Sequence, residues 1–374
     1  MTRSESDVLV VFPTRYCNIE CDHCIVDSGP RRRGTIDVAA ASTAIEGAAM
    51  AGMSAVVFSG GESLVYEPAL LSMCEHAHRL GLRTRVFTNG FWARSASRAQ
   101  DQLERLARGH VDELVVSIDE YHAPWVPPDR VHHIVRAATH AAAVPFIFYQ
   151  LVVPPRAMPD PEPGVWPPAV LQVLDAYGLA VERCVPFAAV DERCRRDPLG
   201  PAHALDALTR EHMVLQWLPA FSGGRTRQRL PTLGTQRSLA DAPGRGCAAV
   251  GRQITVTPEG NVYPCCSTWT NLAQRSLGRL TEVPRPADFA DMVDEIRADP
   301  VVRAIHHHGP GRMLAVLAEE GHAIRGRYAD ICDRCEDLLS RFGRPQLEHA
   351  ARELEGRTML AWLTSDAPVD RSDA

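Results

Sequence analysis

The sequence predicts an α/β fold, a partial (β/α)6 TIM-like barrel followed by a small α+β domain. Two observations lead to this prediction. Strand and helix signals alternate through the first two thirds of the chain, and cysteines flank a predicted hairpin in the last third. Alternating β and α segments indicate a parallel sheet with right-handed crossovers. Six β/α pairs or near-pairs are too few for a closed eight-stranded barrel, so an open barrel or a doubly wound sheet is expected.

Six short apolar runs are the predicted strands, and five helices lie between them. The strands are expected at residues 8–12, 54–59, 83–88, 112–118, 145–153 and 179–187. The helices are expected at residues 37–50, 67–80, 96–108, 130–143 and 168–177. Asp37 suits a helix start, while Gly81, Gly109 and Gly178 suit helix ends because glycine readily ends a helix. In such a sheet, ligands bind at the carboxyl ends of the strands.

The last third of the chain is expected to form a second domain. Residues 222–246 are rich in Gly, Arg, Ser and Pro and are predicted to be a linker after a first domain at 1–221. The second domain, at 247–340, begins with a predicted hairpin over 252–264. Further helices are expected at residues 286–298, 313–321 and 346–363, the last within a C-terminal segment, 341–374, whose end is predicted to be disordered.

The composition excludes several classes of protein. The 374 residues carry a formal net charge of -6, so no basic nucleic-acid-binding surface is indicated. No apolar run is long enough to cross a membrane and no signal peptide is recognisable, which predicts a cytoplasmic protein that binds neither membrane nor nucleic acid. All 40 basic residues are arginine, which excludes chemistry that needs a lysine amine.

Regularly spaced cysteines form two groups, and the first is a C-x3-C-x2-C run. Cys17, Cys21 and Cys24 follow the first predicted strand. In a cytoplasmic protein such spacing is typical of metal ligands, and the odd total of 11 cysteines argues against a disulfide framework. Three thiolates on one loop can hold three irons of a [4Fe-4S] cluster and leave the fourth iron open. A zinc site is the alternative, although structural zinc takes four protein ligands.

Together with motifs at later strand ends, this cysteine run resembles that of the radical S-adenosylmethionine (radical SAM) enzymes. His23, an aromatic-like residue, stands before the last cysteine, and Gly60-Gly61-Glu62 after the second predicted strand resembles the family's GGE motif. Thr88-Asn89-Gly90 and Ser117-Ile118-Asp119 stand where these enzymes carry similar strand-end motifs. The resemblance covers roughly residues 8–220.

Two departures from the family pattern are visible. Ser63 stands where many members have proline after the GGE motif. The family's glycine-rich segment after the fifth strand is not recognisable, since only Val152-Val153-Pro154-Pro155 stands there. The residues that contact the adenine of S-adenosylmethionine therefore stay unassigned.

The resemblance implies a definite chemistry for the first cysteine group. The open iron would bind the amino and carboxylate groups of S-adenosylmethionine, and the reduced cluster would cleave its sulfonium C–S bond. The resulting 5′-deoxyadenosyl radical would take a hydrogen atom from the substrate, and a flavodoxin- or ferredoxin-type protein would supply the electron. Gly60, Gly61, Glu62, Asn89 and Ser117 are the expected cofactor-binding residues, with the glycines letting main-chain carbonyls approach the cofactor's ammonium group.

The second cysteine group is Cys247, Cys265, Cys332 and Cys335. The first two flank the predicted hairpin, and the last two form a C-x2-C pair expected on a distant loop. Four thiolates can close a zinc site. In this setting the pattern looks like the twitch domain, the shortened relative of the SPASM domain of radical SAM enzymes, which implies a second, auxiliary [4Fe-4S] cluster. Cys266 adjoins Cys265 and is an alternative ligand.

Several residues near the strand ends are candidates for catalysis. Asp119, Glu120 and Tyr121 follow the fourth predicted strand, where a base could deprotonate the substrate, although a solvated loop is the alternative. Cys184 and Cys194 lie near the end of the sixth predicted strand. A thiol there could return a hydrogen atom in an epimerisation, but such cysteines more often pack in the core.

The expected function is that of a radical SAM oxidoreductase. The substrate expected is a small polar metabolite, such as a sugar, aminocyclitol or nucleoside of specialised metabolism. This expectation rests on Cys17, because the sixteen residues before it leave no room for a leader-recognition domain. One alternative is a maturase that cross-links or epimerises a peptide, with leader recognition on a separate protein. Another is a non-catalytic iron–sulfur or zinc protein for electron transfer or binding.

Overall fold

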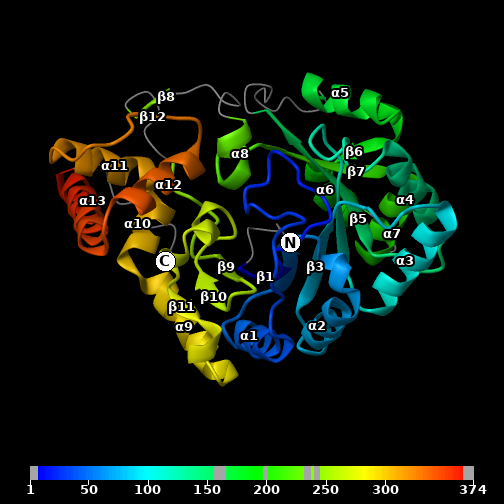
Figure 1. The fold of residues 1–374 in the computed structure, drawn as a ribbon, viewed down its shortest axis with the longest axis horizontal. Helices are drawn as coiled ribbons and strands as arrows, with labels where there is room; N and C mark the ends of the chain where they lie inside the picture. Colours follow the sequence, from blue (N-terminus) through cyan, green and yellow to red (C-terminus); the bar gives the residue numbers. More distant parts are fainter. Residues whose placement is uncertain (1–6, 155–165, 197–200, 231–236, 240–244, 365–374) are drawn as a thin grey trace.

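The computed structural model describes residues 7–154, 166–196, 201–230, 237–239 and 245–364, and its centre is one curved sheet (Figure 1). Ten strands follow the order β11-β10-β9-β1-β2-β3-β4-β5-β7-β6. The barrel strands are β1 (Val8–Thr14), β2 (Ala55–Gly60), β3 (Arg83–Thr88), β4 (Glu113–Ser117), β5 (Phe146–Val153), β6 (Cys184–Pro186) and β7 (Met213–Pro219). Neighbours among these seven are all parallel, which confirms the predicted α/β class.

The barrel strands bury apolar side chains on both faces, as parallel strands covered on both sides do. In β1, Leu9 and Val11 belong to the large core under the helices. Val10 and Phe12 alternate with them and pack with Val57 in a separate inner cluster. The covering helices are α1 (Val38–Met50), α2 (Glu67–Arg79), α3 (Ala96–Arg108), α4 (Pro128–His140), α5 (Pro168–Ala176), α6 (Val190–Arg196) and α7 (Pro201–Glu211).

The predicted sixth strand, 179–187, is wrong in extent and in place. Only Cys184–Pro186 is extended, as β6, and Val181–Arg183 before it is a 3-10 turn. The strand that pairs with β5 is β7, whose Val214–Pro219 align with Phe148–Val153. The longer apolar run of β7 can pair along most of β5, whereas β6 is confined to the sheet edge by its short length.

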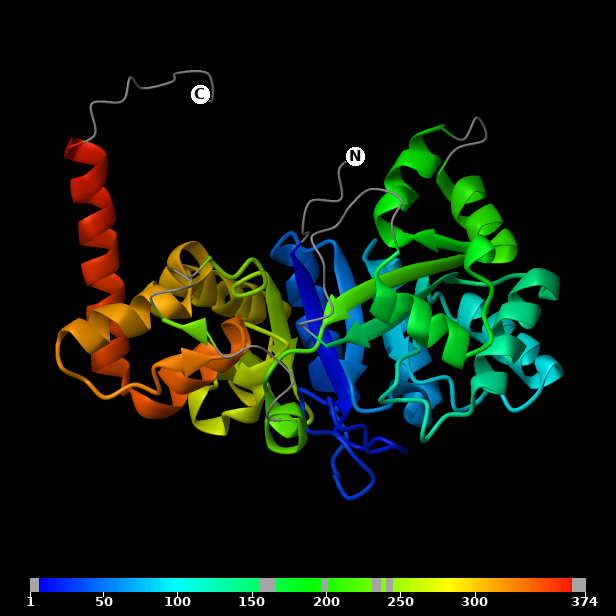
Figure 2. The same cartoon turned by 90° about the horizontal axis from the view of Figure 1, so that it is seen from above.

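The same sheet continues into the last third of the chain. The predicted hairpin is present as β9 (Gln253–Val256) and β10 (Asn261–Tyr263), and β11 (Gly278–Arg279) extends it. β9 pairs in parallel with β1, Val8 lying opposite Gln253. A two-stranded sheet joins β8 (Arg237–Ser238) and β12 (Arg327–Tyr328). Figure 2 shows the C-terminal helices gathered beyond β9, on the other side of β1 from most of the barrel helices.

The helices of the last third are α9 (Pro286–Ala298), α10 (Pro300–His308), α11 (Pro310–Glu319), α12 (Ile331–Arg341) and α13 (Arg344–Thr364). Cys332 and Cys335 lie in the first turns of α12, so the expectation of a loop for this pair is wrong. Within the predicted linker, Gly224–Arg229 form the short helix α8. The predicted disordered end, 366–374, lies outside the described residues. Among the helices that the structure describes, none is both long and apolar enough to cross a membrane.

Candidate cluster and cofactor site

The first cysteine group lies on a loop that follows β1 and folds back on itself. The loop is closed by Cys17 N–H, which donates to the carbonyl of Gly29 (3.3 Å), and by Gly29 N–H, which donates to that of Arg15 (3.4 Å). Cys21 is buried, and Cys17 and Cys24 are half-buried. We call residues 15–29 the cluster loop. It brings the three predicted thiols together at the carboxyl end of the barrel strands.

The thiols of the cluster loop fit a cationic metal group. Burial raises the pKa of Cys17 to about 12, and the nearby Glu62 carboxylate adds to the shift. A thiolate at such a site is costly unless a cation compensates its charge. Three soft sulfur ligands on one loop suit an iron–sulfur cluster with one iron left open.

Gly60 and Gly61 let the end of β2 lie directly against the cluster loop. Gly60 has a φ of 93°, and a Cβ at Gly61 would overlap the carbonyl oxygen of Tyr16. The N–H of Gly61 donates to Thr14 O (2.8 Å), and that of Glu62 donates to Tyr16 O (2.9 Å). The close approach that requires glycine here is therefore to the cluster loop itself. Contact of these two residues with a cofactor stays a prediction.

Glu62 ties the ends of β2 and β3 together. Its buried carboxylate accepts hydrogen bonds from Thr88 Oγ1 (2.9 Å), Asn89 N (2.8 Å) and Leu64 N (3.2 Å). Burial raises the pKa of Glu62 to about 7. Because its oxygens are taken up by donors of the protein, the observed role of Glu62 is to position the neighbouring backbone.

Asn89 in turn holds the cluster loop. Its Nδ2 donates to Asn18 Oδ1 at 2.9 Å and lies 3.8 Å from the Sγ of Cys17. Ser117, also predicted to bind the cofactor, is half-buried at the end of β4, where it pairs with Gln150. The structure thus brings Asn89 next to a predicted iron ligand. No local spacing marks Asn18, because its contact with Asn89 joins residues far apart in the chain.

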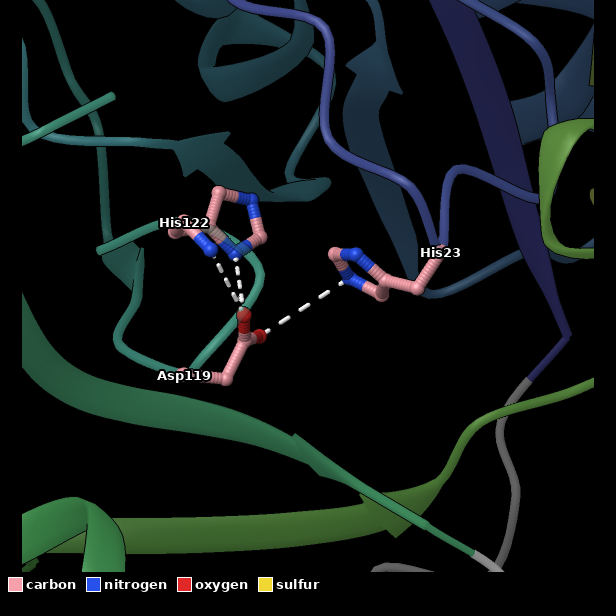
Figure 3. Close-up of side chains that lie close together, drawn as sticks. All are labelled: His23, Asp119 and His122. Atoms are coloured by element: carbon pink, nitrogen blue, oxygen red, sulfur yellow. Dashed lines mark hydrogen bonds and ion pairs between the residues drawn. The ribbon is translucent and has the colours of Figure 1, made fainter. Parts of the chain in front are cut away.

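Asp119 is the centre of a buried polar cluster after β4 (Figure 3). Its carboxylate accepts hydrogen bonds from Tyr121 N (3.0 Å), His122 N (3.0 Å) and Val152 N (3.3 Å). The Nδ1 of His122 lies 2.8 Å from Oδ1 of Asp119, and the Nε2 of His23 lies 3.8 Å from Oδ2. The ring of Tyr121 stacks on that of His23, whereas Glu120 is exposed.

The charges in this cluster follow from burial and pairing. Burial opposes ionisation of Asp119, yet the neighbouring His122 and His23 bring the pKa of its carboxyl down to about 2. Burial disfavours the imidazolium of His122, but Asp119 raises its pKa above the usual value. Burial lowers the pKa of His23 to about 4. The result is a neutral His23 beside an Asp119–His122 ion pair, which places a proton donor near the cluster loop.

The four cysteines of the second group line one small cavity. Cys247, Cys265, Cys332 and Cys335 share it with Ile305 and Ile331. Burial raises the pKa of Cys265 and of Cys332 well above the usual value, and the neighbouring thiols of the group add to the shift. Four converging sulfur donors in an apolar pocket fit a fully ligated iron–sulfur cluster or a zinc ion.

Cys266 faces away from this cavity. Its Sγ donates to Oε1 of Gln253 (3.0 Å), and it packs against the inner barrel cluster that contains Phe12. Cys265, whose Sγ accepts from the N–H of Ser267 (3.4 Å), is thus the member of the pair that joins the group. Cys184 begins β6, at the amino end of the strands and away from both cysteine groups.

Comparison with known proteins gives a match to one family model and to one curated relative. Residues 11–147 match the family model described as the radical SAM superfamily. YydG of Bacillus subtilis (strain 168), which bears the name "Putative peptide biosynthesis protein YydG", is 28% identical over 329 residues, covering 87% of this chain and 89% of YydG.

Two groups of solved structures are similar to this chain. BtrN in complex with AdoMet and 2-DOIA has 15% identity and a TM-score of 0.41 over 82% of this chain and 89% of BtrN. Native anSMEcpe with bound AdoMet and Cp18Cys peptide has 12% identity and a TM-score of 0.45 over 93% of this chain and 99% of anSMEcpe. The family match covers the cluster loop and the first strand-end motifs described above, so residues 11–147 of this chain are similar to the radical SAM superfamily.

Proposed function

We propose that this protein is a radical SAM enzyme that modifies a peptide. The observation that carries the proposal is the similarity to YydG, which extends over 87% of this chain. The name of YydG places that protein in peptide biosynthesis. The small polar metabolite expected from the sequence has no comparable support. We therefore replace that expectation with the peptide alternative.

The cluster loop is the proposed site of the reductive chemistry. Cys17, Cys21 and Cys24 would hold a [4Fe-4S] cluster, which supplies one electron that splits S-adenosylmethionine into methionine and a 5′-deoxyadenosyl radical. Gly60, Gly61 and Asn89 support this role because they fix the loop from neighbouring strand ends.

Cys247, Cys265, Cys332 and Cys335 would hold a second [4Fe-4S] cluster in a twitch-like region. The shared cavity of these four thiols supports this assignment. With all four irons ligated by the protein, such a site would serve electron transfer, such as the removal of an electron from a substrate radical. A flavodoxin- or ferredoxin-type reductant in the cytoplasm would serve the first cluster.

Of the three residues predicted to be catalytic, Asp119 and Tyr121 have a positioning role in the proposal. Asp119 would position His122 through the 2.8 Å contact to its Nδ1, and Tyr121 would hold the ring of His23 by stacking. His122 could then donate a proton or hydrogen bond to the peptide. Glu120 is left out because its side chain is exposed.

The test is turnover with peptides. The protein would be reconstituted with iron and sulfide without oxygen and given S-adenosylmethionine, dithionite and synthetic peptides encoded by short reading frames beside its gene. We expect one peptide to stimulate 5′-deoxyadenosine release. In D2O, mass spectrometry would show that peptide losing two hydrogens on cross-linking or gaining one deuterium on epimerisation.

Parallel reactions with sugars, aminocyclitols and nucleosides test the small-metabolite alternative. Stimulation by one of these and by none of the peptides would overturn the proposal. A variant with Cys17, Cys21 and Cys24 all replaced by alanine is the negative control, and it should release no 5′-deoxyadenosine in any reaction.

A further inference from the structure

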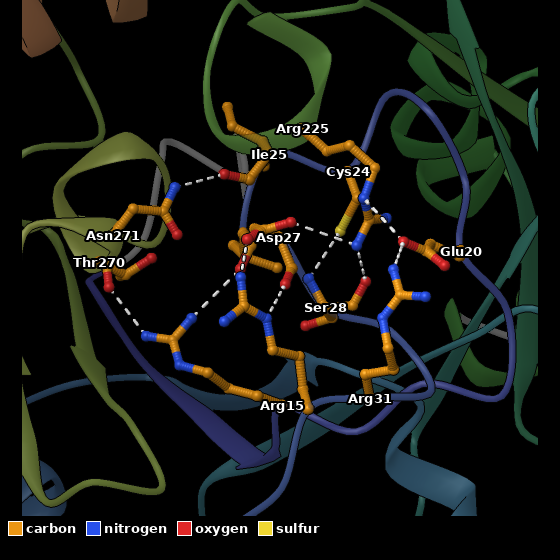
Figure 4. Close-up of polar contacts among 12 residues, drawn as sticks. Arg15, Glu20, Cys24, Ile25, Asp27, Ser28, Arg31, Arg225, Thr270 and Asn271 are labelled. Atoms are coloured by element: carbon orange, nitrogen blue, oxygen red, sulfur yellow. Dashed lines mark hydrogen bonds and ion pairs between the residues drawn. The ribbon is translucent and has the colours of Figure 1, made fainter. Parts of the chain in front are cut away.

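A buried arginine of α8 forms several hydrogen bonds to the cluster loop (Figure 4). The Arg225 side chain is 5% exposed. Its Nη1 donates to the carbonyl of Cys21 (2.9 Å), and its Nη2 donates to that of Ser28. The main-chain N–H of Arg225 donates to the carbonyl of Cys24 (3.0 Å). One residue therefore binds the backbone of two of the three predicted iron ligands.

Two glycines bring α8 close enough for these contacts. Gly224 has a φ of 51°, and a Cβ on it would overlap the carbonyl oxygen of Ile25 and lie 2.8 Å from that of Cys24. A Cβ on Gly223 would lie 2.9 Å from Cγ1 of Ile25. The start of α8 can thus approach the cluster loop only with glycine at both positions.

Residues that follow Cys265 form a second set of hydrogen bonds to the same loop. Asn271 Nδ2 donates to the carbonyl of Ile25 (2.7 Å). Arg15 connects the cluster loop to this stretch, since its Nη1 donates to Val26 O (3.2 Å) and its Nη2 donates to Thr270 O (2.8 Å). Hydrogen bonds from the rest of the protein thus hold residues 21–28 from two sides, which favours a preorganised loop.

The charge of Arg225 matters as well as its hydrogen bonds. Its nearest acidic partners are Asp27 (3.2 Å) and Glu20 (3.9 Å), both on the cluster loop. Glu20 also pairs with Arg31 and Arg229, and Asp27 also pairs with Arg32, but those three arginine side chains are exposed. Solvent screens their charges, whereas the guanidinium of Arg225 is buried beside the cysteines. Net charge and hydrogen bonding near an iron–sulfur cluster set its reduction potential, and a buried cation favours the reduced, more negative state.

We propose that Arg225 is a positioning residue that preorganises the cluster loop and raises the reduction potential of the cluster bound there. The proposal rests on the proposed cluster site of Cys17, Cys21 and Cys24. It does not depend on the nature of the substrate, so it can hold even where the peptide assignment fails.

The test compares Arg225→Gln with Arg225→Lys and with Arg229→Gln. Arg229 lies on the same helix and shares the partner Glu20 (3.2 Å), besides Asp22 (2.8 Å), but its side chain is 44% exposed, so solvent screens its charge. The readout is a redox titration of the iron-loaded proteins by electron paramagnetic resonance, following the signal that S-adenosylmethionine perturbs. That signal reports a cluster with an open iron and needs no turnover.

We expect Arg225→Gln to shift the potential to a more negative value, Arg225→Lys to restore most of it, and Arg229→Gln to leave it unchanged. An unchanged potential in Arg225→Gln, or equal shifts in the Gln and Lys variants, would overturn the proposed role of the charge. Absence of any signal perturbed by S-adenosylmethionine in the unsubstituted protein would instead contradict the cluster site itself.

Hydrogen exchange of the iron-free proteins tests the preorganisation. In Arg225→Gln we expect amides 21–29 to exchange at least tenfold faster while the barrel strands keep their protection. This measurement also decides the case in which the variant binds no iron. Unchanged exchange in residues 21–29, or a loss of protection throughout the barrel, would show that Arg225 does not act on the loop specifically.

Discussion

At the scale of single residues, Glu62 shows how a polar group at a strand end can support its neighbours. Replacing it with alanine leaves the donors of Thr88, Asn89 and Leu64 without their acceptor. Unsatisfied buried donors are costly, so Glu62→Ala should lower the free energy of unfolding by about 3 kcal/mol in urea titrations of the iron-free protein. Glu75→Ala, at an exposed helix position, should change it by less than about 0.5 kcal/mol. Equal effects would contradict the role given to Glu62.

The raised pKa of Glu62 makes a separate prediction about pH. Its folded pKa is about 7 against an ordinary 4.5, so the folded state binds the extra proton between these values and its stability falls as the pH rises through them. Relative to Glu62→Gln, which does not titrate, the unsubstituted protein should lose about 3 kcal/mol between pH 4.5 and 7. Urea unfolding of both iron-free proteins across this range measures the difference. A constant difference would show that the carboxyl is not buried as described.

Gly61 tests whether the strand end must lie against the cluster loop. Gly61→Ala forces a Cβ onto the Tyr16 carbonyl and should displace the loop, lowering iron content after reconstitution and stability by about 2 kcal/mol. Gly356→Ala is the matched control, since that glycine lies inside α13 with open space around it. There alanine should stabilise the protein by about 0.5 kcal/mol. Full iron content in Gly61→Ala would contradict the steric argument.

At the scale of elements, the turn after β10 decides which of two adjacent cysteines can bind metal. Cys265→Ala removes a thiol from the cavity shared with Cys247, Cys332 and Cys335, whereas Cys266→Ala does not. We expect reconstituted Cys265→Ala to lose about four irons per chain, the content of one cluster, and Cys266→Ala to keep them. Iron and sulfide analysis checks this. Zinc in the purified protein, or iron loss only in Cys266→Ala, would contradict the assignment.

The elements also show which features of the fold the sequence could predict. The first five strands and the hairpin follow from local apolar runs and turn residues, and they lie close to their predicted positions. The sixth strand does not, because pairing with β5 depends on which distant segment fits its edge. Residues 213–219 fit that edge, and no local signal separates them from 179–187.

The candidate site also combines features that local sequence signals predict with contacts that they do not. Cysteine spacing and the Gly60-Gly61-Glu62 motif are local signals, and the structure places them around one loop. The contacts of Arg225 with Cys21 and of Asn271 with Ile25 join residues more than two hundred positions apart. Such partners have no periodicity or spacing to mark them, because only the folded chain brings them together.

At the scale of the whole molecule, the barrel and the C-terminal part share one sheet and one helix interface. β1 pairs with β9, and Gly47 of α1 packs so closely on α9 that a Cβ there would lie 2.7 Å from Cβ of Phe289. Strands of one sheet should unfold together, so Gly47→Ala should lower the stability of both parts by about 2 kcal/mol in a single transition. Hydrogen exchange during urea unfolding measures this, and the β1 and β9 peptides should lose protection together, whereas the control Gly356→Ala should not be destabilised. Loss of protection in β9 at a lower urea concentration than in β1 would show that the C-terminal part is a separate unit.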